Sequence, residues 1–169
     1  MNEKGKSKMN KKDIELQRSL EFLANGWEVS KLDIDYLHET ISLIVESIRQ
    51  QQIVRTHITF KEVLSFYVYQ EEVAYSETLD ATYRLNDRGK DDNILVSEIG
   101  FHRNGFGQVK IECIDSEQTA IDAITSKTNM YFQVNNKDHF FIECNAIEIN
   151  DDVFEGLIQS SESLKITLD

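Results

Sequence analysis

The residues best suited to chemistry are few: four histidines and two cysteines, namely His38, His57, His102, His139, Cys113 and Cys144. Metal sites hold such residues at fixed spacings, as in H-E-x-x-H or C-x-x-C, and neither motif occurs in the chain. Glu98 and His102 are four residues apart, but they fall in a segment expected to be a strand. That spacing does not bring two strand side chains to one point. The sequence therefore predicts no metal site and no cofactor.

Nucleophilic and phosphate-binding motifs are also missing from the sequence. Gly100, Gly105 and Gly107 are not followed by the Gly-Lys-Ser/Thr of a phosphate-binding loop, and they are better explained as turn and bulge residues. Neither cysteine has a histidine close to it in sequence, so both are expected to be small core residues. Carboxylates are abundant, but no catalytic pair can be identified among them. A catalytic centre is therefore not expected.

A short polar segment, with His38 and Glu39 beside Tyr36, precedes the alternating apolar residues that begin at Ile41. His38 and Glu39 are expected to be buried or half-buried groups that make hydrogen bonds. A structural role is favoured over a catalytic one.

The charge is strongly uneven along the chain. The net charge is −12, but residues 1–12 hold five lysines and one glutamate, so the remainder carries −16. A body this acidic repels nucleic-acid phosphates, and it attracts basic protein surfaces. The sequence predicts no nucleic-acid partner and favours a basic protein partner, although acidity can also serve solubility alone.

Length and hydropathy predict one folded unit outside a membrane. The 169 residues are enough for a single core, and we expect a disordered basic tail over 1–12 followed by one domain over 13–169. No run of about 18 apolar residues is present, and no apolar segment follows the N-terminal lysines as in a secretory signal. A cytoplasmic location and no membrane partner are expected.

The organising element is a hairpin over 131–150. Four turn-forming residues, 135–138, separate two runs rich in aromatic and β-branched side chains. In the second run Phe140, Ile142 and Cys144 share one face, but after Asn145 the apolar residues are Ile147 and Ile149. This slip predicts a β-bulge or a strand that changes faces.

The first half of the chain indicates further strands after a short helix. Residues 13–24 fit a helix ended by Asn25 and Gly26. Residues 31–49 fit either a helix or a strand, and a strand is favoured because 53–60 and 63–69 are clearly β-like. Gln50, Gln51 and Gln52 are expected to form a loop, and Lys61 with Glu62 a tight corner.

The second half mixes turn signals with short periodic runs. Asn104 and Gly105 predict a hairpin between 94–101 and 106–114. Asp115 and Gln118 fit a helix start, and the apolar residues after them predict a helix near 116–126. Part of 71–79 is expected to be helical, 86–93 a long loop, 153–158 a short helix, and 164–168 an edge strand. The expected fold is α+β, predominantly an antiparallel β-sheet (sandwich or curled sheet), with short terminal helices.

The runs at 35–45, 58–63 and 141–149 (Phe-Ile-Glu-Cys-Asn-Ala-Ile-Glu-Ile) resemble small bacterial proteins. These are the YxiG-like proteins of Firmicutes and neighbouring β-rich immunity proteins of polymorphic toxin clusters. The resemblance covers roughly 30–150 and lies in the hydrophobic pattern. It implies a β-rich fold without enzymatic activity and a cognate protein toxin as partner.

The combined expectation is a non-enzymatic acidic binding protein, of immunity type, whose acidic face docks on a basic toxin surface. A small-molecule-binding β-rich domain and a hydrolase with dispersed carboxylates remain as alternatives. The oligomeric state is left open. The candidate partner-binding residues are acids from polar segments and two tyrosines, namely Asp91, Asp92, Asp151, Asp152, Glu155, Tyr75 and Tyr83.

Overall fold

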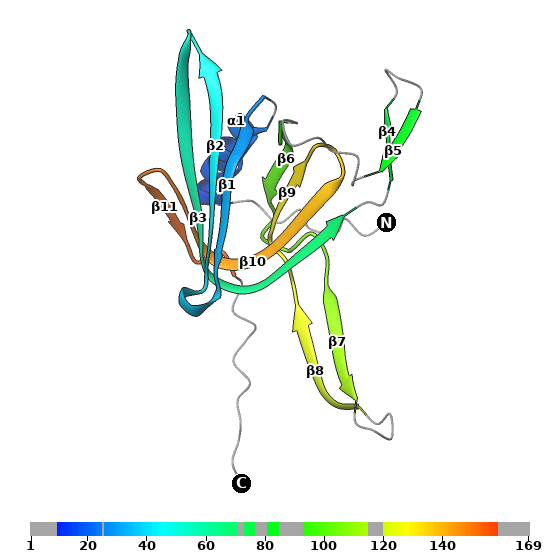
Figure 1. Ribbon diagram of the computed structural model, residues 1–169. Coiled ribbons are helices and arrows are strands. Elements are labelled where there is room, and N and C mark those ends of the chain that lie inside the picture. Colours follow the sequence, from blue (N-terminus) through cyan, green and yellow to red (C-terminus); the bar gives the residue numbers. More distant parts are fainter. Residues whose placement is uncertain are drawn as a thin grey trace, which may run out of the picture.

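A computed structural model describes residues 10–24, 26–70, 73–76, 81–84, 93–114 and 120–158. For 73–76, 81–84, 111–114 and 120–124 it describes the backbone only. Strands dominate the described chain, and the largest sheet has the order β1-β2-β3-β10-β9-β6, all antiparallel, with β11 paired to β10 (Figure 1). The predicted fold class, α+β with a large antiparallel sheet, is confirmed.

The strands of this sheet are β1 (Glu28–Asp35), β2 (Thr40–Arg49), β3 (Gln52–Gln70), β6 (Val96–Phe101), β9 (Met130–Val134), β10 (Asp138–Ile149) and β11 (Asp152–Glu155). Two further hairpins pair separately, β4 (Val73–Ser76) with β5 (Ala81–Arg84) and β7 (Val109–Ile114) with β8 (Ala120–Ser126). The sheet is curled, because its end strands meet at one bridge, Glu28 with Leu95. The bridge is held by the N–H of Val29, which donates to the carbonyl of Ile94 at 2.6 Å.

The predicted N-terminal helix is confirmed as α1 (Lys11–Leu23). Asn10 caps it by accepting a hydrogen bond from the Asp13 N–H at 2.9 Å. The helix thus starts two residues earlier than expected and takes Lys11 and Lys12 from the expected tail, of which 1–9 lie outside the described residues. Its buried residues include Leu16, Leu20 and Leu23, on one helical face.

Helix α1 covers the outer edge of β6. The side chain of Gln17 accepts a hydrogen bond from the Phe101 N–H at 3.0 Å, in the place where another strand would pair. Arg103, just after β6, forms an ion pair with Asp13 on the helix, with its Nε 2.7 Å from Oδ2. These contacts fix the one described helix to the sheet.

Strand β3 is the longest element, at 19 residues. The strand preferred over a helix for 31–49 is confirmed in type, but the segment forms two strands, β1 and β2, with a 3₁₀ turn over 36–38 between them. Gln50 and Gln51 form the expected turn into β3 with left-handed backbone, whereas Gln52 already belongs to β3. The corner expected at Lys61 and Glu62 is wrong, because the strand continues through them. β10 pairs with β3 on both sides of this point, so β3 bends there, with φ 52° at Glu62 and a register shift, and does not turn back.

The hairpin predicted over 131–150 is confirmed. β9 and β10 pair across a turn in which Asn135 and Asn136 have positive φ. The predicted slip is also confirmed, because Ala146 and Ile147 are adjacent and both buried. β10 therefore changes the set of residues that it directs into the core, near the point where its neighbour changes from β9 to β11.

The second predicted hairpin is wrong in its pairing. The chain does turn at Gly105, whose N–H donates to the His102 carbonyl at 2.7 Å. However, β6 pairs with β9 and β7 pairs with β8. β6 pairs with β9, which is distant in sequence, because this pairing places Val96, Ile99 and Phe101 in the core.

Three expected helices are strands where they are described. The helix near 116–126 is wrong over 120–126, because β8 pairs with β7 from Ala120 to Ser126, while 115–119 lie outside the described residues. The helix within 71–79 is wrong over 73–76, where β4 pairs with β5. The helix at 153–158 is wrong because β11 pairs with β10, Phe154 opposite Ile147. The segments 86–92 and 164–168 lie outside the described residues.

The core lies inside the curl of the sheet. Phe60, Phe132 and Phe140 stack there, with the Phe132 and Phe140 ring centroids 4.3 Å apart. Cys144 is fully buried, and this burial raises the pKa of its thiol to about 12. The expectation of a core cysteine is therefore confirmed for Cys144, whereas the Cys113 side chain lies outside the described residues.

Candidate functional site

Four large apolar side chains are exposed together where β1 passes into β2. Ile34, Tyr36, Leu37 and Leu64 have exposed fractions of 56%, 81%, 74% and 66%. Four carboxylates, Asp33, Asp35, Glu39 and Glu62, are exposed among them. We call these eight residues, together with His38, the acidic tip. Exposed apolar groups of this kind, with polar residues around them, are typical of interaction surfaces.

A short 3₁₀ helix, η1 (Tyr36–His38), builds the tip. Its N-cap is Asp35, whose Oδ1 accepts from the His38 N–H at 3.2 Å. Glu39 then takes a left-handed conformation with φ 53°, which returns the chain into β2. This tight local turn leaves no room to fold Tyr36 and Leu37 into the core, so both point outward.

The bend of β3 brings the remaining residues to the tip. The Val63 N–H donates to the Glu39 carbonyl at 2.9 Å, which ties η1 to the bent part of β3. The neighbouring Leu64 is the residue that the register shift leaves unpaired with β10. The shift therefore exposes an apolar side chain beside η1.

The carboxylates of the tip differ in their local partners. Asp35 is 2.7 Å from the Nδ1 atom of His38, and the hydrogen bond from this histidine lowers the pKa of Asp35. Asp33 pairs with Lys31, and Glu62 accepts a hydrogen bond from the Asn145 amide at 2.7 Å. The Glu39 carboxylate makes no hydrogen bond or ion pair with the described residues. The tip therefore presents anionic oxygens that remain accessible to a partner.

A shallow groove of about 180 Å³ runs beside η1, with Ile34, Tyr36, Val63, Leu64 and Phe66 in its walls. Small-molecule pockets usually enclose ~300–1,000 Å³. This groove is smaller, and a second hollow at the tip, of about 490 Å³ and lined by Ile34, Tyr36 and Leu37 among others, falls within that range. The volume of the groove beside η1 is that of about one large side chain, and most of its lining is apolar. The groove thus gives the acidic tip a place for an anchor residue.

A second apolar pocket, of about 270 Å³, opens between β1 and the first residues of β10. Leu32, Leu43, Phe132 and Phe140 are among the residues that line it. This volume is also below the usual range for small-molecule pockets.

The predicted site residues are only partly described. Asp151 and Asp152 are exposed at the β10–β11 turn, and Glu155 is exposed on β11. They form a separate acidic position at the far end of β10. Tyr75 and Tyr83 lie in β4 and β5, with their side chains outside the described residues, and Asp91 and Asp92 lie outside them altogether.

The expectation that His38 and Glu39 are buried or half-buried is wrong. Both are exposed, as is the neighbouring Tyr36, although His38 does make the expected hydrogen bond. A signal was present in the sequence: two large apolar residues, Tyr36 and Leu37, stand between two alternating runs, inside a turn. Residues of this kind in a turn indicate a contact surface more readily than a core position.

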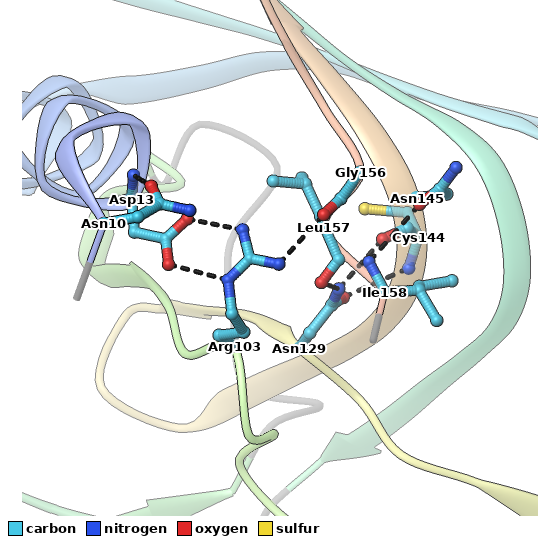
Figure 2. A network of polar contacts seen from close by, with 9 residues as sticks. All are labelled: Asn10, Asp13, Arg103, Asn129, Cys144, Asn145, Gly156, Leu157 and Ile158. Carbon is cyan, nitrogen blue, oxygen red and sulfur yellow. Dashed lines mark hydrogen bonds and ion pairs between the residues drawn. The ribbon is translucent and has the colours of Figure 1, made fainter. Parts of the chain in front are cut away.

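Three carboxylates that are buried or half-buried each pair with one cation. Asp13 pairs with Arg103, whose Nη1 also donates to the Gly156 carbonyl at 2.9 Å (Figure 2). Glu148 pairs with Lys61, and Glu46 pairs with Arg55. Within the described part of the chain, no three His, Cys, Asp or Glu side chains gather as metal ligands. These pairs act as structural contacts between elements.

Helix α1, the one α-helix among the described residues, is neither long nor apolar enough to cross a membrane. Comparison with curated proteins gives no match, and comparison with solved structures gives none either. A model of the family described as YxiG-like protein matches residues 16–154, from α1 to β11. This match covers most of the chain and all but the last residue of the large sheet, and it shows that the chain belongs to the YxiG-like family.

Proposed function

We propose that this chain is a non-enzymatic binding protein of immunity type, which neutralises a cognate toxin by docking its acidic tip on a basic surface of that toxin. The observation that carries the proposal is the exposure of Ile34, Tyr36, Leu37 and Leu64 among four carboxylates. The likeness to immunity proteins in hydrophobic pattern supports the same function. A cytoplasmic site of action is part of the proposal.

The two kinds of residue have separate roles in the proposed complex. Carboxylates on a body of net charge −12 accelerate the encounter with a basic surface. Buried tyrosine and leucine side chains slow dissociation, because aromatic anchors supply much of the binding energy in protein interfaces. Tyr36, with 81% of its surface exposed, is the expected anchor, and the groove beside it receives a side chain from the toxin.

The active surfaces of enzymes that cleave nucleic acid are basic, because they bind phosphates. A protein that carries carboxylates on a projecting turn can occupy such a surface and exclude the substrate. This mechanism requires no reacting group in the binding protein.

The first test is the gene next to this one. The proposal expects a secreted toxin encoded immediately upstream, and its absence counts against the toxin assignment. The second test is co-expression of that toxin domain with the full-length chain, read as cell growth and as recovery of the complex by affinity purification. Failure of the chain both to bind and to protect overturns the proposed function.

Matched charge variants then locate the surface. Asp35→Asn with Glu39→Gln removes two charges from the acidic tip, and Asp151→Asn with Asp152→Asn removes two from the β10–β11 turn. We expect the first pair to reduce the association rate about tenfold at low salt and the second to change it less than twofold. Equal reductions of the association rate by the two double variants would show that only the net charge of the chain matters. A larger reduction by Asp151→Asn with Asp152→Asn would instead assign the docking surface to the β10–β11 turn.

Anchor variants give an independent measurement. Tyr36→Ala is expected to raise the dissociation rate by about thirtyfold or more, since hot-spot truncations cost ~2 kcal/mol or more. Ile48→Ala removes an equally exposed apolar residue near the β2–β3 turn, with 77% of its surface exposed, and should leave the rate unchanged. Unchanged dissociation in Tyr36→Ala would contradict the assigned anchor.

A further inference from the structure

The outer face of the sheet carries a second group of rings, partly half-buried and partly exposed, separate from the acidic tip. Four strands, β6, β9, β10 and β3, place residues side by side in two cross-strand rows. One row is Gly100, Tyr131, Phe141 and Tyr67, and the next is Glu98, Gln133, His139 and Tyr69. Directly opposed residues of a sheet share a face. The alternate residues Phe101, Phe132 and Ile142 are in the core, so these rows lie on the outer face.

The rings of these rows contact one another across the strands. The Tyr131 centroid is 5.2 Å from that of Phe141 and 6.1 Å from that of His139, and His139 is 5.8 Å from Tyr69. The Tyr131 hydroxyl also lies 3.0 Å from His139 Nδ1. These centroid distances are typical of aromatic rings that pack against one another.

One further ring joins this group beside Gly100. Phe106 packs against Tyr131 with centroids 5.6 Å apart, and a Cβ atom on Gly100 would lie 3.6 Å from its ring. Phe106 thus lies next to the position that a side chain at Gly100 would take. We call Tyr67, Tyr69, Phe106, Tyr131, His139 and Phe141 the outer ring face. Tyr69 and Phe106 are its most accessible members, with 61% and 42% of their surfaces exposed.

A carboxylate stands at each end of the outer ring face. Glu98 begins the second row, is exposed, and makes no side-chain hydrogen bond or ion pair with the described residues. Glu143 follows Phe141 on the same face, and its Oε2 accepts from Ser126 Oγ at 2.8 Å and from the Lys127 N–H at 3.0 Å. Its Oε1 makes no hydrogen bond or ion pair with the described residues.

We propose that the outer ring face binds arginine side chains of a partner protein. A guanidinium is planar, stacks on aromatic rings and donates paired hydrogen bonds to a carboxylate, so rings flanked by Glu98 and Glu143 meet each of its requirements. Lysine offers charge without a plane to stack. The acidity of the chain further favours a cationic group over a neutral or anionic one.

The dimensions fit individual side chains and not a second copy of the chain. The four strands span three spacings of ~4.8 Å, about 14 Å, and the rows are ~7 Å apart. A stable dimer needs roughly 800 Å² from each partner, which is several times the area of the two rows. One or two guanidinium groups on an extended segment would cover the face.

The inference holds or fails without the toxin assignment, because its test uses simple peptides. Labelled hexaarginine and hexalysine are titrated into the full-length protein at ~150 mM salt, where general attraction to acidic proteins is reduced, and binding is read by fluorescence anisotropy. Each contact between a guanidinium group and an exposed aromatic ring is expected to change the affinity about two- to fivefold. We expect hexaarginine to bind at least five times more tightly than hexalysine.

Paired variants assign that preference to the outer ring face. Tyr69→Leu with Phe106→Leu should bring the two affinities to within about twofold of each other and leave hexalysine binding unchanged. Tyr36→Leu removes a ring from the acidic tip and should preserve the preference for arginine. If the double variant loses its cooperative thermal transition, Tyr69→Leu alone and Glu98→Gln replace it, each expected to weaken hexaarginine binding two- to fivefold. Equal affinity for both peptides in the original protein, or a preference that survives these variants, overturns the proposal.

Discussion

The side chain of Asn129 pairs with the backbone of Cys144 as a neighbouring strand would. Its Oδ1 accepts from the Cys144 N–H at 3.1 Å, and its Nδ2 donates to the Cys144 carbonyl at 2.9 Å (Figure 2). This pairing occupies the gap along β10 where β9 ends and β11 has not begun. Nδ2 also reaches the Leu157 carbonyl at 3.3 Å, so one amide joins three segments of the chain.

The first prediction concerns this amide. Asn129→Ala leaves the buried N–H and carbonyl of Cys144 without partners, and each such group costs about 1–3 kcal/mol. We expect the free energy of unfolding to fall by about 2–5 kcal/mol in urea denaturation. Gln52→Ala, at an exposed position of β3, is the matched control and should change it by less than ~0.5 kcal/mol. An effect no larger than that of the control would show that water or a rearranged β10 forms hydrogen bonds with the backbone N–H and carbonyl of Cys144 in the variant.

Local patterns in the sequence were sufficient to predict part of this architecture. The hairpin turn at Asn135 and Asn136 was predictable because these residues tolerate the left-handed backbone that it needs. The slip after Asn145 was visible as a change of alternation, and the strand over 40–49 followed from its β-like neighbours. Each of these features depends on residues close together in the chain.

Features that depend on distant pairing were not predictable in the same way. Ala120, Ile121, Ala123 and Ile124 fit a helix or a strand, and it is the pairing with β7 that makes β8 a strand. Similarly, β6 pairs with β9 although the whole β7–β8 hairpin lies between these two strands in the sequence. The acidic tip needed the register shift of β3 to bring Leu64 beside η1, and the outer ring face needed four strands in register.

The second prediction concerns the contact between α1 and the end of β6. Asp13 is buried and pairs with Arg103, so Arg103→Met leaves a buried carboxylate unpaired. Breaking a buried pair costs about 3 kcal/mol or more, and the loss of the bond to Gly156 adds to it. Thermal unfolding should therefore shift to lower temperature by several degrees. Lys11→Ala breaks the exposed pair with Glu15 and should have almost no effect, and similar shifts in both variants would contradict the structural role of Arg103.

The third prediction concerns the pH dependence of the acidic tip. The hydrogen bond from His38 lowers the pKa of Asp35 below its ordinary value of 3.8. Because the folded-state pKa is depressed, the contact contributes above the unfolded-state pKa and is lost as the pH falls through the folded-state pKa. An NMR titration of the Asp35 carboxyl should give a midpoint below 3.8, and His38→Asn should raise it, because the donor ring is removed. His57→Asn, on the neighbouring β3, is the control, and an unchanged Asp35 midpoint in His38→Asn would contradict the assigned cause.

The last prediction concerns the turn that follows β6. Gly105 has φ +84°, and a Cβ atom there would lie 2.7 Å from Lys127 Cγ and 3.1 Å from the Thr128 carbonyl oxygen. Gly105→Ala therefore combines a disfavoured left-handed backbone with a close contact, and residues held in such conformations cost ~1–3 kcal/mol. Gly107→Ala is the matched control, because its Cβ would meet nothing within 4 Å. We expect the free energies of unfolding of the two variants, measured in urea, to differ by at least ~1 kcal/mol.

The same turn also positions Phe106 of the outer ring face. Gly105→Ala should therefore reduce the preference for hexaarginine over hexalysine, whereas Gly107→Ala should leave that preference intact. Equal stability and equal peptide binding in the two variants would show that the turn can rearrange without cost.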